Sequence, residues 1–323
     1  MIKMMLENGR KRSTVSNSKF SLFFSLIDYR NNYYTSDDTN KIKEFYNSFK
    51  NRDQLIQWMK NRPKGAAYIY EVDGEKDVIV VIPTANLNGI YARECMENIF
   101  KGLHIIFVES GEIPDPYFNY AYNCNIGIRK AMEYNPKWIV VSNDDMYKID
   151  YVRILKAELS ALDNKEISFV LTNISGQLHS LTEHIGRGTL IRRMFMLSLP
   201  KYKEKRKLER KFGVRILTWR EWYNKFILKV LYKEITNVKA SFSFGIISSQ
   251  FINDQNKILF DETYINGMED IDLAMMIKAN SAKVHYINYK IGSRNGSTLG
   301  TGESRVLRDL LNKLYFQEKF YRE

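Results

Sequence analysis

Cysteine is scarce in this sequence, and long hydrophobic runs are missing from it. The two cysteines among its 323 residues, Cys95 and Cys124, form neither a Cys-x-x-Cys pair nor a disulfide framework. This usage is typical of a reducing compartment. No apolar stretch of signal-peptide length begins the sequence, and apolar runs such as residues 78–85 are far shorter than the roughly 18 residues that span a bilayer. We therefore expect a cytoplasmic protein, either soluble or peripheral on the inner face of a membrane.

Two common nucleotide-binding motifs are also absent. The sequence has no Gly-x-x-x-x-Gly-Lys-Ser/Thr loop, and no Gly-x-Gly-x-x-Gly follows a predicted strand. These absences exclude the usual P-loop and dinucleotide-binding proteins. The four histidines show no metal-ligand spacing.

The positive charge is concentrated in one segment. The chain has a net charge of +12, and residues 187–233 hold fifteen basic and three acidic residues, which account for the whole excess. Because a nucleic-acid-binding protein is usually basic over its whole binding domain, no nucleic acid is expected as a partner. Apolar residues between the charges, such as Trp222 and Phe226, are typical of an amphipathic element that docks on an anionic membrane. RNA or an acidic glycan is the competing ligand for this segment.

Hydrophobic periodicity predicts an α/β protein. Buried strands are predicted at residues 78–82, 103–111, 138–142, 167–175, 240–252 and 283–292. Helical patterns lie between the first four of these runs, and a last helix is predicted at residues 305–321. This alternation indicates βαβ units and a mostly parallel sheet flanked by helices.

A helical extension is predicted ahead of this domain. Residues 39–65 repeat apolar side chains at helical spacing, whereas residues 1–35 are expected to be a weakly ordered basic segment. Residues 66–74 fit either a strand or an extended arm. The predicted divisions are an N-terminal helical extension at 1–75 and an α/β domain at 76–323, with a basic helical insert at 187–235.

The first three predicted strands each end in a segment that contains polar residues. These strand ends are Pro83, Thr84, Ala85 and Asn86 after the first, Glu109 near the end of the second, and Asn143, Asp144 and Asp145 after the third. Ligands of open α/β sheets bind beyond the carboxyl ends of the strands, so these residues are candidates for a site. A divalent cation at Asp145, Mg²⁺ or Mn²⁺, would neutralise a diphosphate group. A turn or a cap is the plainer explanation of such an aspartate pair.

A second acidic cluster lies far along the chain. Its members are Asp261, Glu262, Glu269, Asp270 and Asp272. Carboxylates in a first helical turn are stabilised by the helix dipole, which is the structural explanation. A carboxylate at Glu269 or Asp270 would also suit the removal of a proton from an attacking hydroxyl group.

Together these motifs resemble those of nucleotide-sugar-dependent glycosyltransferases of the GT-A fold, in particular family 2. The similarity runs from about residue 77 to residue 322, without the basic insert. The similar segments are VIVVIPTAN, IIFVESG, NCNIGIRKA, VVSNDDM and FDETYINGMEDIDLAMMIKANSAKVHYI. The resemblance implies a GT-A-like sheet and an inverting glycosyltransferase. Such an enzyme would move a sugar from a nucleoside diphosphate sugar to an acceptor hydroxyl, on a lipid-linked or cell-surface glycan.

The resemblance also implies roles for particular residues. Asp270 would be the general base, with Glu269 as acceptor ligand or second choice, and Asp145 would hold the divalent cation. The implied nucleotide-sugar-binding residues are Pro83, Thr84, Ala85, Asn86, Glu109, Asn125, Arg129, Asn143, Asp144 and Arg294. The chain departs from the family pattern at two places. It has Asn143 where the family's metal motif begins with an acidic residue, and it has Arg294 near the position where the family often has a histidine.

Two other functions share these features. A sugar nucleotidyltransferase uses a related sheet and metal site, but it usually carries Arg and Lys in a Gly-rich loop after the first strand, and PTANLNG has neither. A catalytically inactive nucleotide-sugar-binding protein of the same fold would explain Asn143 and the missing histidine.

Overall fold

The computed structural model describes most of the chain outside the basic insert. The described residues are 12–14, 29–111, 115–174, 179–180, 203–213, 239–240, 243–294, 300 and 302–321. Most of the predicted insert, including Trp222 and Phe226, lies outside these residues.

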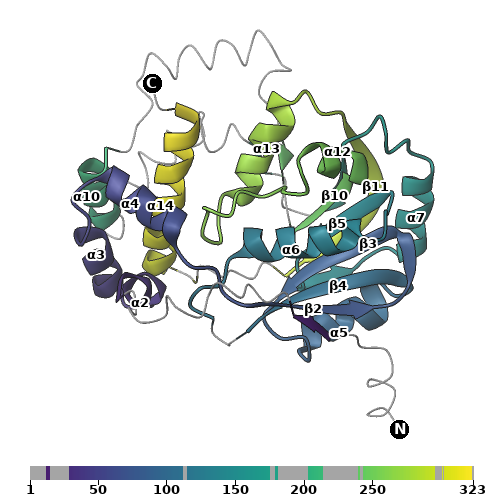
Figure 1. Ribbon diagram of the computed structural model, residues 1–323, viewed down its shortest axis with the longest axis horizontal. Helices are drawn as coiled ribbons and strands as arrows, with labels where there is room; N and C mark the ends of the chain where they lie inside the picture. Colours follow the sequence, from purple (N-terminus) through teal and green to yellow (C-terminus); the bar gives the residue numbers. More distant parts are fainter. Residues whose placement is uncertain are drawn as a thin grey trace.

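A nine-stranded sheet lies at the centre of the described structure (Figure 1). Its strands, in spatial order, are β1 (Arg12–Thr14), β2 (Ala67–Val72), β4 (Leu103–Ser110), β3 (Glu75–Thr84), β5 (Trp138–Ser142), β10 (Phe244–Ser248), β7 (Phe169–Ile174), β11 (Val284–Ser293) and β6 (Met146–Lys148). Two short strands, β8 (His179–Ser180) and β9 (Lys239–Ala240), pair separately. The predicted α/β class is confirmed.

The sheet is mixed, so the prediction of a mostly parallel sheet is wrong. Strand β3 is parallel to β4 and β5, and β11 is parallel to β7. The other pairings of described strands are antiparallel, including both pairings of β10. A strand that is buried on both faces has the same apolar composition in either direction, so its hydrophobic pattern does not reveal its orientation.

Helices pack on both faces of the sheet and also form a separate group. They are α2 (Tyr29–Thr35), α3 (Thr39–Asn47), α4 (Arg52–Asn61), α5 (Ile90–Glu94), the π-helix η1 (Cys95–Ile99), α6 (Tyr120–Met132), α7 (Val152–Ser160), α10 (Lys203–Lys211), α12 (Ser249–Asp254), α13 (Glu269–Ala279) and α14 (Gly302–Tyr321). The periodicity of β3 explains the two layers, because successive side chains of a strand point to opposite faces. Ile79 and Val81 share a core with α6, α12 and α13, whereas Val80 and Ile82 share one with α5, η1 and α7.

The helical group combines the two ends of the described chain. Helices α2, α3, α4, α10 and α14 enclose a third core, on the left in Figure 1, that includes Phe45, Tyr46 and Trp58. The helical pattern predicted at residues 39–65 is therefore confirmed by α3 and α4. The expectation of weak order as far as residue 35 is wrong for α2, where Tyr34 is buried against Phe45 and Trp58.

The structure decides between the two alternatives for one element and corrects the bounds of another. Residues 67–72 are not an arm, since β2 pairs antiparallel with β4 along its whole length. The strand predicted to run to residue 252 ends instead at Ser248, because the Ser248 hydroxyl accepts a hydrogen bond from the Phe251 backbone N–H and caps α12.

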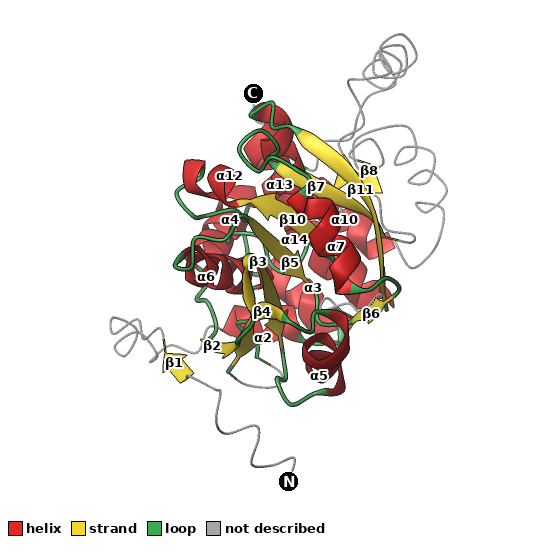
Figure 2. Cartoon of the chain, turned by 90° about the vertical axis from the view of Figure 1, so that its right-hand side faces the viewer, coloured by secondary structure: helices red, strands yellow, loops and turns green. Residues whose placement is uncertain are grey.

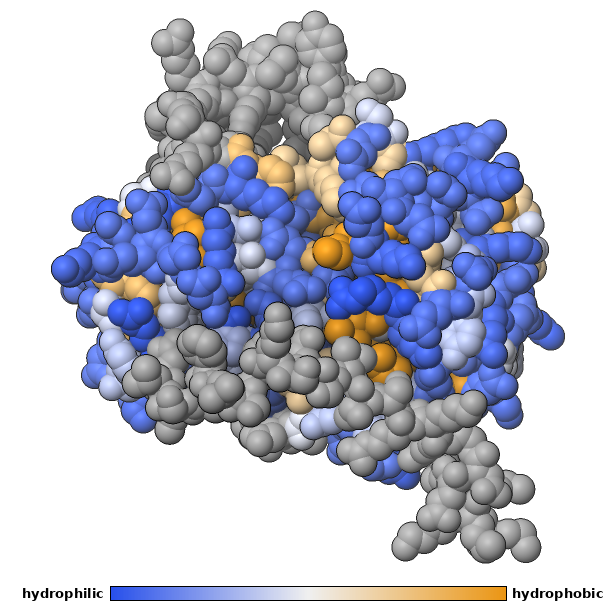
Figure 3. Space-filling view, in the orientation of Figure 1, coloured by the Kyte–Doolittle hydropathy of each residue, from blue (hydrophilic) through white to orange (hydrophobic). Residues whose placement is uncertain are grey.

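Most of one face of the molecule is hydrophilic. Figure 3 shows hydrophobic residues mainly in limited areas near its middle, between the helical group and the sheet. Of the helices in the described ranges, none combines the length and the apolar character needed to cross a membrane.

Candidate functional site

The carboxyl ends of β3, β4 and β5 meet at one edge of the sheet, as predicted. The parallel register places Thr84 opposite Glu109. On the side of β3 that pairs with β5, the Thr84 hydroxyl donates a hydrogen bond to Asp144 Oδ2 at 2.7 Å. The backbone N–H of Leu87 donates to Glu109 Oε1 at 2.8 Å, which holds the loop after β3 against the end of β4.

Residues of the loop after β3 differ in their accessibility. Pro83 is buried within β3, whereas Ala85 and Asn86 are exposed. Asn86 accepts a hydrogen bond from the backbone N–H of Asn88 at 3.0 Å through its side chain, and from that of Gly89 at 2.9 Å through its backbone oxygen. These bonds form the turn that leads into α5 and leave the loop open to a ligand.

Arg294 joins the end of β11 to this edge. Its backbone N–H donates to the Asp145 carbonyl oxygen at 3.0 Å, and its guanidinium donates to Glu94 Oε2 at 2.7 Å. The guanidinium carbon also lies over the rings of Tyr91 and Tyr147, at 5.3 and 5.8 Å from their centroids. The backbone of Arg294 therefore lies beside the aspartate pair, while its guanidinium is bound to Glu94.

The aspartate pair could hold a divalent cation only together with other ligands, such as the phosphates of a substrate. Burial raises the pKa of Asp144, and the charge of Asp145 adds to this effect, while the Thr84 hydrogen bond opposes it. Within the described ranges, no three His, Cys, Asp or Glu side chains gather as a metal site. Asp144 and Asp145 thus supply at most two carboxylates, and Mg²⁺ is commonly held by one or two carboxylates together with substrate phosphates and water.

Hydrogen bonds fix the start of α13 at the same edge. Helix α6 begins there because it follows β4. The side-chain amide of Asn119, the N-cap of α6, donates to the carbonyl oxygens of Glu262 and Tyr264 at 3.0 and 2.9 Å. The Tyr120 backbone N–H donates to Asn266 Oδ1 at 2.9 Å. The loop before α13 is therefore attached to the first turn of α6.

Glu269 is the most perturbed carboxyl group of this region. It is 7% exposed, and its Oε2 atom has no hydrogen-bond partner among the described residues. Burial, together with the neighbouring charge of Asp270, raises its pKa to about 8. The positive end of the helix dipole favours the ionised form and therefore acts in the opposite direction. Glu269 is consequently protonated for the most part at pH 7, and a protonated carboxyl group can donate a hydrogen bond.

Tyr120 links the two acidic clusters and was not identified from the sequence. Its hydroxyl donates to Asn143 Oδ1 at 3.0 Å. Burial raises its pKa strongly, and the charges of Glu269 and Asp270 contribute. The available signal was its place in the chain, because a residue that begins a helix after a parallel strand lies at the carboxyl edge of the sheet.

The remaining acids of the second cluster have structural partners. Lys319 of α14 contacts Asp261 Oδ2 at 2.8 Å and Asp272 Oδ1 at 2.8 Å. Asp261 also accepts a hydrogen bond from the Thr263 backbone N–H at 2.9 Å, and Asp272 accepts one from the Tyr264 hydroxyl at 3.0 Å. Asp261 and Asp272 therefore have structural partners, which are an ion pair with α14 and hydrogen bonds rather than the helix dipole alone.

Two predicted nucleotide-sugar-binding residues do not join the site. The fully buried Asn125 amide donates to Phe260 O and Glu262 Oε1, and its oxygen accepts hydrogen bonds from the backbone N–H groups of Leu259 and Phe260. All its hydrogen-bonding capacity is therefore used to support this loop. Arg129 lies in the last turn of α6, away from the edge where that helix begins.

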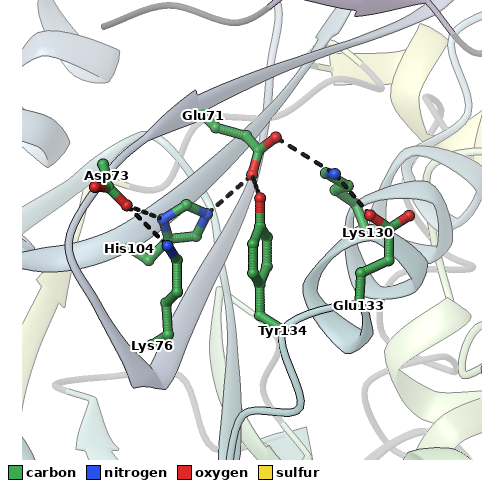
Figure 4. A network of polar contacts seen from close by, with 7 residues as sticks. All are labelled: Glu71, Asp73, Lys76, His104, Lys130, Glu133 and Tyr134. Atoms are coloured by element: carbon green, nitrogen blue, oxygen red, sulfur yellow. Dashed lines mark hydrogen bonds and ion pairs between the residues drawn. The ribbon is translucent and has the colours of Figure 1, made fainter.

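Figure 4 shows the polar network at this opposite edge, beside the end of α6. Glu71 of β2 accepts a hydrogen bond from the Tyr134 hydroxyl at 2.6 Å and lies 3.0 Å from His104 Nε2. Lys130, the neighbour of Arg129, contacts Glu71 at 3.6 Å and Glu133 at 2.7 Å. Because His104 is near the start of β4, this network marks the amino edge of the parallel strands.

An open cavity of about 420 Å³ lies elsewhere, between α2 and α4. Its lining residues are Arg30, Gln54, Gln57, Trp58 and Asn61. None of the predicted site residues contributes to it, and its walls offer no carboxylate. We therefore place the candidate site at the carboxyl edge of the sheet.

Comparison with known proteins assigns no family to the chain. No protein-family model matches it, and no curated protein matches it either. The resemblance to glycosyltransferases of family 2 therefore stays a prediction that depends on the motifs themselves.

Proposed function

We propose that the protein is an inverting glycosyltransferase with a GT-A-like arrangement of its α/β domain. The observation that carries this proposal is the attachment of the α13 start to the first turn of α6, which brings Glu269 and Asp270 to the edge that holds Asp144 and Asp145. A sugar transfer by direct displacement needs these two functions together, one to stabilise a leaving diphosphate and one to deprotonate an acceptor.

In the proposed reaction, the acceptor oxygen attacks the anomeric carbon of the donor sugar as the bond to the diphosphate breaks. Asp270 takes the proton of the acceptor hydroxyl. Glu269, neutral at pH 7, donates a hydrogen bond that orients the acceptor. The loop at Ala85 and Asn86, with Glu109, seats the nucleotide.

Charge on the leaving diphosphate is met by two groups of the chain. Arg294, whose backbone N–H contacts Asp145, would turn its guanidinium from Glu94 and the Met146 carbonyl oxygen to the diphosphate. Asp145, with Asp144, would hold Mg²⁺ or Mn²⁺, which when bound would neutralise phosphate charge. Asp144 stays attached to β3 through Thr84, so the two strand ends keep their separation while a ligand binds.

Thermal melts with nucleoside diphosphates test the proposal. We expect UDP, GDP or dTDP to raise the melting temperature, because a ligand that binds only the folded state stabilises it. Manganese should increase the shift, and Asp145→Asn should remove the manganese-dependent part. Asp270→Asn should keep nucleotide binding but lose sugar transfer. The proposal fails if none of the three nucleotides shifts the melt, with or without manganese.

Product analysis separates the related functions. Pyrophosphate release from a nucleoside triphosphate and a sugar phosphate would identify a nucleotidyltransferase. Nucleotide protection without transfer or donor hydrolysis would favour an inactive binding protein. The hydrogen bond from the Tyr120 hydroxyl to Asn143 Oδ1 is the observation on the side of an inactive binding protein, since it gives the Asn143 amide a structural partner.

The basic insert remains a proposed membrane contact. Its described part, α10, packs Leu208 and Phe212 into the helical core and leaves Lys203, Lys207 and Arg210 exposed. Exposed cations on an anchored helix suit an anionic surface that presents a lipid-linked acceptor.

A further inference from the structure

Exposed hydrophobic side chains gather on one part of the surface next to the candidate site, and the proposed reaction gives these side chains no role. Ten large hydrophobic side chains of the described structure are exposed, and six of them lie in residues 90–91 and 147–154. These six, which we call the rim patch, are Ile90, Tyr91, Tyr147, Ile149, Tyr151 and Ile154. Ile90 is 71% exposed and Tyr151 is 58% exposed. Single exposed apolar residues are common, but a gathering of this kind indicates an interaction surface.

Contacts join the two segments that supply the rim patch. Figure 2 shows α5, β6 and α7 along one side of the sheet. Arg294 lies over the rings of both Tyr91 and Tyr147, which joins α5 to β6. Lys148 of β6 donates a hydrogen bond to Asn98 Oδ1 at 3.1 Å, a second link between these segments. Residues 149–151 then connect β6 directly to α7.

The Tyr147 ring packs on the backbone of the neighbouring strand β11. A Cβ added at Gly292 would overlap the Tyr147 ring, so the ring packs directly on the glycine backbone. The ring is nevertheless 37% exposed. The sheet therefore supports the patch at Tyr147.

Cations border the patch. Lys148 and Arg153 lie over the Tyr151 ring, at 4.1 and 5.2 Å from its centroid. Of the carboxylates beside them, Glu94 is paired with Arg294, and Asp150 accepts a hydrogen bond from a backbone N–H of β11. Cations around an apolar centre disfavour pairing with a second copy of the same face and favour an anionic partner.

We propose that the rim patch docks the protein on an anionic lipid bilayer. Isoleucines enter the boundary between headgroups and acyl chains, tyrosines are suited to the same depth, and Lys and Arg reach phosphate groups. A sugar or a nucleobase would stack on the tyrosine rings but would not require three exposed isoleucines. This surface is distinct from the basic insert and does not depend on the proposed catalytic activity.

A fluorescent label at the patch tests the proposal on the full chain. Both native cysteines are buried, so Ile149→Cys can be labelled selectively with the environment-sensitive dye NBD. In vesicles of phosphatidylcholine and phosphatidylglycerol, its emission should rise and shift to shorter wavelength. Vesicles of phosphatidylcholine alone should have a much weaker effect. The same label at Ile258, which is 53% exposed at the end of α12, should report no insertion.

Substitutions then test whether the patch causes binding. Ile90→Asp with Ile149→Asp should weaken sedimentation with the anionic vesicles by about tenfold or more, since two isoleucines leave the interface. Ile258→Asp is the matched control and should bind as the unchanged protein does. Failure to bind at low salt would overturn the proposal. It would also be overturned by sedimentation that leaves the Ile149 label unchanged, because the basic insert or another surface would then be responsible.

Discussion

Replacing Glu269 by glutamine should make the protein more stable at neutral pH. Glutamine keeps the shape of the side chain but does not ionise. The folded-state pKa of Glu269 is about 8, against an ordinary value of 4.5. The unfolded chain therefore loses this proton from about pH 4.5 upward, while the folded protein retains it until about pH 8. Stability falls across that interval by about 1.4 kcal/mol per pH unit, which amounts to about 3 kcal/mol at pH 7.

Urea unfolding from pH 5 to pH 8 measures this difference. We expect Glu269→Gln and the unchanged protein to differ little at pH 5 and to diverge as the pH rises, with the variant more stable. Other carboxyl groups of raised pKa, such as Asp144, contribute equally to both proteins and cancel in the difference. Glu133→Gln, at an exposed position, is the control and should change stability by less than about 0.5 kcal/mol at every pH. Parallel curves for Glu269→Gln and the unchanged protein would show that Glu269 titrates normally.

Three further substitutions test the framework of the site, each by urea unfolding. Asn125→Ala removes four hydrogen bonds that hold the loop before α13 and should cost about 3 kcal/mol; a loss below about 1 kcal/mol would contradict that role. Gly127→Ala places a methyl group against a valine of β3 and should cost about 2 kcal/mol by pushing α6 from the sheet; an unchanged midpoint would refute the close packing. Lys319→Met leaves Asp261 and Asp272 without their cation and should cost about 2 kcal/mol at pH 7. Since Lys319 holds the pKa of Asp261 below its ordinary value, this loss should shrink below about pH 4, and a loss independent of pH would argue against the ion pairs.

The sequence was sufficient to locate the strand ends. Continuous β-branched runs identify strands buried on both faces, and polar residues directly after them must lie at a sheet edge. This reasoning predicted the proximity of Thr84, Asp144 and Asp145, which the structure confirms. The inference is valid for β3, β4 and β5 because these strands are parallel, so their carboxyl ends lie on the same side of the sheet.

Two other parts of the prediction were wrong or incomplete: the direction of β10, and the placement of Asn125 and Arg129 at the site. The residues of β10 have the same apolar character as those of β5, yet β10 runs the opposite way, because direction depends on which connections pack best. Asn125 and Arg129 were grouped with the site by their motif. Helix α6 has 13 residues, and a rise of about 1.5 Å per residue carries Arg129 more than about 10 Å from the end of the helix that contacts the site.

Tyr120 shows what a linear motif does not contain. Its role arises from a hydrogen bond to Asn143, 23 residues away, and from its burial beside Glu269. Neither contact follows from the local pattern around residue 120. Contacts of this kind require the packing of α6 against the sheet, which only the three-dimensional structure provides.

The union of both ends of the described chain in one helical core has a consequence for biosynthesis. The Tyr46 hydroxyl donates to the Leu307 carbonyl oxygen, and Arg52 donates to that of Leu314 at 2.8 Å. Residues of α3 and α4 are made before those of α14. Phe45, Tyr46 and Trp58 therefore lack their covering helix until α14 has been synthesised, and exposed apolar surface of this kind favours aggregation. The helical core can close only after that point.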